Sequence, residues 1–313
     1  MLDIFLLGTG GMMPLPGRWL SSMLLRHEGA LALVDCGEGT QVPMKQAGWG
    51  FKAVDYIFFT HCHADHIAGL PGLALTIGNA GKETPLDLYG PPGLRRVAES
   101  LLVLCPDLPF DVRVAELPMS GEAAEEATAA GFPLFGSFMF GYMPADHGMP
   151  CVSYRFSVRR RGEFFPNRAR ALNIPVRHWR TLQLGVPVTL EDGREIEPGM
   201  VTGPERKGVS VCYCTDSRPT ARMPEFFKNT DLLVCEGLYG DDAQQQNAAG
   251  KRHMVFGEAA RLASEAGAGE LWLTHYSPAM PNPHDYIEAA TTRFANSICG
   301  RDLMAKTLSF REV

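Results

Sequence analysis

The sequence contains no long hydrophobic run. Although 45% of its 313 residues are hydrophobic, no apolar segment approaches the length of about 18 residues that a membrane-spanning helix requires. The N-terminus also lacks a basic stretch followed by an apolar one, which is the pattern of a secretory signal. We therefore expect a cytoplasmic protein without a membrane span.

Paired cysteines are missing as well. The eight cysteines form no Cys-x-x-Cys motif, and several lie in apolar segments, where a free thiol packs as a small hydrophobic group. This distribution favours reduced thiols in a cytosolic protein over a disulfide framework.

The chain has no general excess of positive charge. Its net charge of −6 argues against a protein that coats nucleic acid. The charge is uneven, however, because residues 155–180 contain eight arginines and one acid, interleaved with Phe164, Phe165 and Trp179. Arginine and aromatic side chains bind phosphates and unstacked bases. The segment is either such a binding surface or a solvated edge whose arginines pair with acids.

A dense group of metal donors is present instead. The motif His61-Cys62-His63-Ala64-Asp65-His66 follows an apolar run at 54–59 that predicts a buried strand. His61 and His63 are spaced to bind one ion while Asp65 and His66 turn toward a second. Imidazole and carboxylate ligands suit zinc.

Three further candidate ligands, His147, Asp216 and His275, each lie beside a strand-like segment. Loops at the ends of rigid strands are where such sites are built. We predict two zinc ions per chain, with manganese able to enter the oxygen-richer second site. The predicted ligands are His61, His63 and His147 for the first ion, Asp65, His66 and His275 for the second, and Asp216 as a bridge.

These motifs resemble those of the metallo-β-lactamase superfamily and, within it, of the ribonuclease Z family. The resemblance covers nearly the whole chain. The histidine motif indicates the superfamily, whereas the string Asp-Cys-Gly-Glu-Gly-Thr-Gln at 35–41 and the pair Glu236 and His253 indicate ribonuclease Z. The other segments that carry the resemblance are 5–11, 60–72, 190–194, 215–220, 252–254 and 273–277.

The resemblance implies an α/β fold, the four-layer αββα sandwich of the metallo-β-lactamase type. It implies a single domain over residues 1–313 with an inserted basic arm at 155–205. The implied activity is that of a dizinc phosphodiesterase, an endonuclease that trims the 3′ end of tRNA precursors with an ion-bridging water as nucleophile. Asp65 would orient that water. His253, held by Glu236, would protonate the leaving oxygen.

The resemblance also implies a homodimer that binds the tRNA precursor across two subunits. The sequence supports a dimer only indirectly, through apolar residues expected to be exposed, such as Phe135, Phe138 and Phe140. The chain departs from the family pattern because residues 174–179 stand where the arm usually carries a Gly-Pro motif, and residues 12–20 lack the usual Lys/Arg-rich run. The arginines expected to bind RNA are Arg159, Arg160, Arg161, Arg177 and Arg180.

Two alternatives remain open. One is a dizinc hydrolase of a small phosphate or sulfate ester. The other is a non-catalytic, metal-bearing RNA-binding protein, against which Asp65, His253 and Glu236 argue, because binding alone needs no proton donor.

The hydrophobic patterns predict alternating strands and helices, with two packed sheets and helices outside them. Asp35, after one strand, is expected to be a turn residue or a support for the site. The segment 121–131 reads as a helix or an exposed loop. The predicted strands are 2–7, 22–27, 30–35, 54–59, 86–89, 111–116, 151–158, 209–214, 231–235 and 270–274, and the predicted helices are about 41–48, 66–80, 92–104, 254–266 and 284–295.

Overall fold

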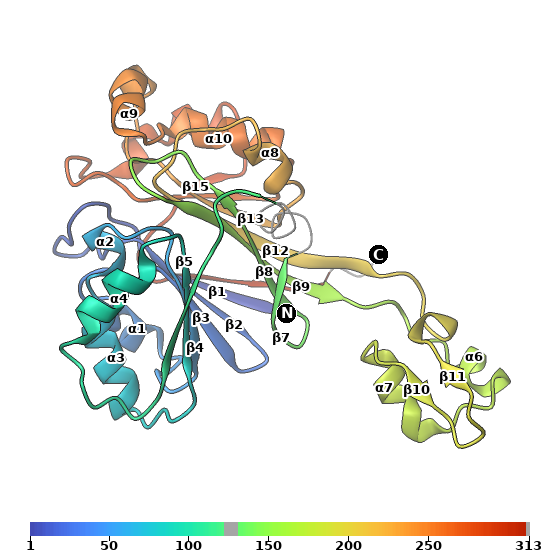
Figure 1. Ribbon diagram of the computed structural model, residues 1–313. Helices are drawn as coiled ribbons and strands as arrows, with labels where there is room; N and C mark the ends of the chain where they lie inside the picture. The colour runs from blue at the N-terminus through green and yellow to red at the C-terminus, as the bar shows by residue number, and fades with distance from the viewer. Residues whose placement is uncertain (122–130, 311–313) are drawn as a thin grey trace.

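Two seven-stranded sheets form the centre of the computed structural model, which describes residues 1–121 and 131–310 (Figure 1). The first sheet has the order β16 (Met304–Leu308), β1 (Leu2–Gly8), β2 (Ser22–His27), β3 (Ala30–Val34), β4 (Val54–Phe58), β5 (Leu86–Gly90) and β6 (Val112–Glu116). The second has the order β15 (Ser297–Cys299), β14 (Leu271–Thr274), β13 (Leu232–Glu236), β12 (Arg206–Cys214), β9 (Val152–Arg160), β8 (Phe138–Pro144) and β7 (Phe132–Phe135).

Helices cover the outer face of each sheet, so the predicted four-layer αββα sandwich is confirmed. Aromatic side chains fill the space between the sheets, where the ring of Phe58 lies 5.0 Å from that of Tyr89 and 4.9 Å from those of Phe140 and Phe156. The first sheet is covered by α1 (Gln41–Ala47), α3 (Leu70–Asn79) and α4 (Leu94–Leu102), and the second by α8 (Met223–Phe226), α10 (Phe256–Glu265) and α11 (Ile287–Thr291).

Residues 161–205, which we call the arm, project from the sandwich between the C-terminal end of β9 and the N-terminal end of β12 (Figure 1). The arm has its own small apolar cluster, which includes Ala169, Leu182 and Ile196. The predicted range begins six residues earlier, within β9. There Arg155 donates to the carbonyl oxygens of Phe226 and Lys228, both at 3.1 Å, and so belongs to the sheet. The arm elements are α6 (Pro166–Ala171), η1 (Val176–His178), α7 (Trp179–Gln183), β10 (Val188–Thr189), β11 (Glu195–Ile196) and η2 (Pro198–Met200).

Some predicted elements were wrong or incomplete. The helix predicted at 66–80 is split into α2 (Ala64–Ile67) and α3, and the one at 284–295 into η4 (Pro283–Tyr286) and α11. Strand β8 was not predicted, although all but its last residue are buried, as in the predicted strands β13 and β14. The prediction for 121–131 falls mainly on residues outside the described part. The short η3 (Asp242–Gln244) and α9 (Gln245–Lys251) were also not predicted.

Phe138 and Phe140 are buried, with 0% and 3% exposure, because β8 faces the other sheet. Their predicted exposure was therefore wrong, and of the three phenylalanines Phe135 alone is exposed. Across the described residues, no helix is both long and apolar enough to cross a bilayer.

Two glycines allow the metal-motif loop to lie against the loop after β3. A side-chain carbon at Gly69, between α2 and α3, would lie 2.0 Å from the carbonyl oxygen of Gly37. One at Gly37 would lie 2.1 Å from the carbonyl oxygen of Asp65. Both obstacles are backbone atoms, so neither position accommodates a larger residue without moving the loops. This close approach fixes the position of the histidine motif 61–66 relative to the loop after β3.

We predict that Gly69→Ala lowers the free energy of unfolding by about 2–3 kcal/mol, because overpacking against backbone cannot relax cheaply. The matched control is Gly250→Ala in α9, where an added side-chain carbon meets nothing within 4 Å. That control should raise stability by roughly 0.5–1 kcal/mol through helix propensity and chain entropy. Urea denaturation measures both changes, and equal stabilisation by both substitutions would contradict the packing argument.

Candidate metal centre

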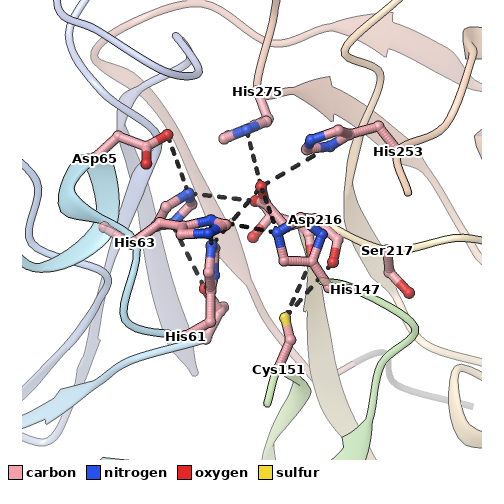
Figure 2. A network of polar contacts seen from close by, with 12 residues as sticks. His61, His63, Asp65, His147, Cys151, Asp216, Ser217, His253 and His275 are labelled. Atoms are coloured by element: carbon pink, nitrogen blue, oxygen red, sulfur yellow. Dashed lines mark hydrogen bonds and ion pairs between the residues drawn. The ribbon is translucent and has the colours of Figure 1, made fainter. Parts of the chain in front are cut away.

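Loops from both sheets bring all seven predicted ligands to one place (Figure 2). The histidine motif follows β4, Asp216 follows β12 and His275 follows β14, while His147 lies between β8 and β9. The donor atoms of His61, His63, His147 and Asp216 lie within 4.8 Å of one another, and so do those of Asp65, His66 and His275. A third group within the same distance consists of Asp216, His253 and His275.

The backbone turns sharply where these strands end. Asp35, Asp216 and His275 have φ angles of 58°, 54° and 58°, in the left-handed region that non-glycine residues rarely adopt. Such conformations cost of order 1 kcal/mol or more each and persist only where the surroundings impose them. Here they turn the three side chains from the sheets into the common site.

The carboxylate of Asp216 lies between the two groups. Its Oδ2 is 3.3 Å from Nε2 of His66, and its Oδ1 is 3.3 Å from Nε2 of His275. The same Oδ1 is 3.9 Å from Nε2 of His61 and 4.0 Å from Nε2 of His147. Asp216 is thus within reach of both positions at which an ion would lie.

Four of the imidazoles are held through Nδ1, which leaves Nε2 directed inward. The Thr60 hydroxyl donates to Asp35, so at 3.1 Å it accepts from Nδ1 of His61. The Ser21 hydroxyl donates to the carbonyl of Gly10, so at 3.3 Å it accepts from Nδ1 of His275. The Nδ1 atoms of His66 and His147 lie 2.8 Å from Oδ2 of Asp35 and 3.4 Å from the carbonyl oxygen of Arg252. These partners select the tautomer whose Nε2 lone pair binds metal.

Asp65 is held from the opposite side of the site. Its Oδ2 accepts a hydrogen bond of 2.8 Å from the backbone amide of Met12 and lies 3.4 Å from Nε2 of His66. Met12 follows the glycine turn at the end of β1, so this turn takes part in building the site.

His253 and Glu236 form a pair beside the ligands. Nδ1 of His253 lies 3.0 Å from Oε2 of Glu236, which is fully buried. The other oxygen, Oε1, accepts a 2.6 Å hydrogen bond from the amide of Ser217. Because Nδ1 is occupied by Glu236, His253 is not free to act as a ligand through that atom, although it lies 3.8 Å from Oδ1 of Asp216.

The site is electrostatically coupled. Burial alone would raise the pKa of Asp216, but the charges of His275, His66 and His61 hold it well below its usual range. Burial would lower the pKa of His66, but Asp216 and Asp35 raise it well above its usual value. Burial would also lower the pKa of His253, but the charge and the hydrogen bond of Glu236 outweigh burial and raise this pKa above its usual value. The buried carboxylate of Asp216 therefore stays ionised and attracts positive charge.

The donor set fits metal ions. Nε2 of His66 and Oδ2 of Asp216 are buried and have no hydrogen-bond partner. Buried polar atoms are nearly always satisfied, so two that face each other indicate a place for a ligand to be bound. Nitrogen donors on one side and mixed nitrogen and oxygen donors on the other suit zinc.

Comparison with known proteins agrees with this site. The family model described as "Beta-lactamase superfamily domain" matches residues 157–276, and the model for the anti-Pycsar protein Apyc1 matches residues 2–100. The chain is 46% identical over 310 residues to ribonuclease Z of Lachnospira eligens, with 99% of both chains covered. It is 43% identical to ribonuclease Z of Clostridium kluyveri, with 100% of both covered.

The chain belongs to the ribonuclease Z family. Its fold is also that of the short form of human tRNase Z, with a TM-score of 0.68 and 24% identity over 98% of this chain and 100% of the other.

Several residues that support this ribonuclease Z site were not predicted. A side-chain carbon at Gly11 would lie 2.8 Å from Nε2 of His275, so the glycine makes room for a ligand. Arg252 donates to the carbonyl oxygen of His147 at 2.6 Å. Thr60 and Arg252 adjoin predicted site residues, which is a weak signal. Ser21 is 254 positions from His275, and no local pattern links the two.

We predict that Asp35→Asn weakens zinc binding roughly 10- to 100-fold, the usual effect of losing a residue that orients a ligand. Oδ1 accepts from the Thr60 amide at 2.8 Å, so the new amide nitrogen would replace Oδ2 and face Nδ1 of His66. That would favour the tautomer with a proton on Nε2. Competition with a chromophoric chelator measures the affinity.

Asp231→Asn is the control, because Asp231 also accepts a backbone hydrogen bond, from Ser210 at 2.8 Å, but at the other end of β12. Equal zinc affinities for the two variants would disprove the role of Asp35.

Proposed function

We propose that the chain is a metal-dependent endoribonuclease that trims the 3′ end of tRNA precursors. The observation that carries the proposal is the location of the His253–Glu236 pair beside the two donor groups. A protein that only binds RNA has no use for an imidazole held by a buried carboxylate next to a metal site. The near full-length similarity to ribonuclease Z proteins supports the substrate class.

We further propose two zinc ions per chain. His61, His63 and His147 would hold one ion, Asp65, His66 and His275 the other, with Asp216 shared between them. When bound, the ions supply a nucleophilic water at neutral pH and stabilise negative charge on the phosphate.

The side chains then move the protons. Asp65, held by the Met12 amide, orients the attacking water and accepts its proton as the new phosphorus–oxygen bond forms. The bond from phosphorus to the 3′ oxygen breaks, and His253 gives this oxygen a proton. Glu236 stabilises the positively charged His253 before that transfer. The products are a tRNA with a free 3′ hydroxyl and a trailer with a 5′ phosphate.

The arm is proposed to bind RNA at a distance from the chemistry. Strand β12 runs from Arg206, next to the arm, to Cys214, near Asp216. Nine residues of extended strand span about 30 Å. The arm also projects away from the sandwich (Figure 1). An arm with this geometry presents RNA to the site of a second subunit, which supports a homodimer.

The candidate RNA-binding arginines lie in two places. Arg177 and Arg180 lie in the arm, and Arg177 is paired with Glu191 at 2.6 Å. Arg159, Arg160 and Arg161 lie at the root of the arm, where Arg159 is 3.8 Å from Glu205 and Arg161 donates to the carbonyl oxygen of Gln183 at 3.2 Å. The residues Arg159, Arg161, Arg177 and Arg180 are exposed, whereas Arg160 is half-buried and its guanidinium lies 5.2 Å from the ring centre of Phe310.

The proposal predicts that zinc-loaded protein cuts a 3′-extended tRNA precursor once, near the end of the acceptor stem. Asp65→Ala should lower the rate roughly 10²- to 10⁴-fold, the usual contribution of a proton-transferring group, with the melting temperature unchanged. The control is Asp107→Ala, a change of an exposed carboxylate outside the site. Gel mapping of the products measures the cut, and an intact precursor at zinc saturation would refute the proposed activity.

Replacing Arg159, Arg160 and Arg161 with Ala should weaken binding of the precursor but leave hydrolysis of a small phosphodiester nearly unchanged. Loss of up to three phosphate contacts should flatten the salt dependence of binding by roughly 2–3 units of slope. The control replaces Arg113, Arg222 and Arg261, exposed arginines outside the arm, with the same change in net charge. Fluorescence anisotropy at several salt concentrations measures binding. Equal weakening by both triple variants would mean that net charge matters and the root of the arm does not.

A further inference from the structure

The guanidinium of Arg218 connects the metal-bridging loop to the loop that carries His253. We propose that Arg218 is a positioning residue that holds His253 in place to protonate the leaving oxygen. The inference rests on the proposed function, because it assumes that His253 is the proton donor. Arg218 is the second residue after Asp216, in the segment Thr215-Asp-Ser-Arg-Pro-Thr220.

Two adjacent residues join the loops around the site. The Ser217 amide donates to Glu236, the carboxylate that holds the ring of His253. Nη1 of Arg218 donates to the backbone carbonyl of His253 itself. The Arg218 amide donates at 3.0 Å to the carbonyl oxygen of Asp146, the residue before the ligand His147. The loop that follows Asp216 therefore holds both the ring of His253, through Glu236, and its main chain, through Arg218.

A buried carboxylate holds the guanidinium in turn. Nη1 donates to Oε2 of Glu258 at 2.8 Å, and Nη2 donates to Oε1, so the pair is bidentate. Glu258 is 4% exposed and also accepts from Gln245 at 2.8 Å and from the Val255 amide at 3.2 Å. Because Glu258 lies in the first turn of α10, the arginine fixes the distance from this helix to the site.

The arrangement needs an arginine and not merely a positive charge. The planar guanidinium binds both oxygens of Glu258 and still donates to a carbonyl oxygen, whereas an ammonium has no such fork. Arg252, which precedes His253, has a φ of 59°. A strained connection of this kind keeps its conformation only when its neighbours hold it. Loss of the Arg218 contact would let His253 move relative to Asp216 without removing any metal ligand.

This role predicts that the effect of Arg218 depends on the leaving group. The 3′ oxygen of a ribonucleotide is a poor leaving group and needs a proton, whereas p-nitrophenolate leaves without one. Arg218→Lys should lower kcat for a 3′-extended tRNA precursor by roughly 10- to 100-fold, part of the usual contribution of general acid catalysis, with KM unchanged. Its effect on bis(p-nitrophenyl) phosphate should be under about threefold by the same reasoning.

The experiment compares wild type, Arg218→Lys, His253→Ala and the double variant on both substrates, with bound zinc and melting temperature measured for each. The double variant should cleave RNA no more slowly than His253→Ala alone, because both changes remove one function. Arg261→Lys is the matched control, since Arg261 is also near an acid, Glu265 at 3.9 Å, but is exposed on α10.

Equal losses on both substrates, additive losses in the double variant, lost zinc or no loss on RNA would each overturn the role of Arg218. If Arg218→Lys does not fold, Glu258→Gln provides the second test, because it loosens the guanidinium without changing Arg218. If His253→Ala itself slows both substrates equally, the proposed proton donor fails, and this outcome is distinct from a failure of Arg218 alone.

Discussion

The carboxylate of Asp216 is buried among the imidazoles of His61, His66, His147 and His275, with 3% of the residue exposed. An ionised carboxylate without positive partners costs several kcal/mol to bury, so this residue requires cations around it. Histidines alone satisfy it only in part, since Oδ2 has no hydrogen-bond partner. The convergence of loops from both sheets, the strained backbone at their ends and the glycines that let the loops approach all follow from this requirement.

The supporting contacts are as specific as the ligands. The imidazoles of His61, His66 and His275 are each oriented by a partner that accepts a hydrogen bond from Nδ1. The partner is either a hydroxyl that donates its own proton to another group or a carboxylate. Asp35, Thr60 and Ser21 therefore determine which nitrogen faces inward. These partners lie next to the ends of β3, β4 and β2, so the sheets hold them in fixed positions around the site. The same principle extends to His253 through Glu236, whose two oxygens are both hydrogen-bonded.

The candidate metal site and the arm are far apart in this molecule. The donors lie at one end of the long strand β12 and the arm at the other, so a charge change in the arm does not reach the metal ligands directly. The overall charge of −6 is compatible with an RNA substrate because residues 155–180, at the root of the arm and in its first half, contain eight arginines and one acid. Substitutions in the arm therefore leave the donor groups of the candidate metal site in place.

Local patterns in the sequence predicted the candidate ligands and most strands of the two large sheets. The residues His61, His63, Asp65 and His66 were identifiable without coordinates because they lie within six positions of the chain. Alternating or continuous apolar runs predicted the strands beside the candidate ligands. Strand β8 was not predicted although nearly all of its residues are buried, and the half-exposed edge strand β16 was not predicted because its alternation is short. The roles of Glu236 and His253 came from family resemblance and not from spacing.

Only the tertiary structure decided the contacts between distant segments. Nothing local in the chain links Ser21 to His275 or Arg218 to Glu258, because such hydrogen bonds depend on how sheets and helices pack and not on sequence separation. The sequence by itself determined which metal-donor side chains are present and how they are spaced along the chain. Packing determined which nitrogen of each ring faces inward, how deep the carboxylates lie and how far the arm stands from the site, since burial and orientation arise only when the layers come together.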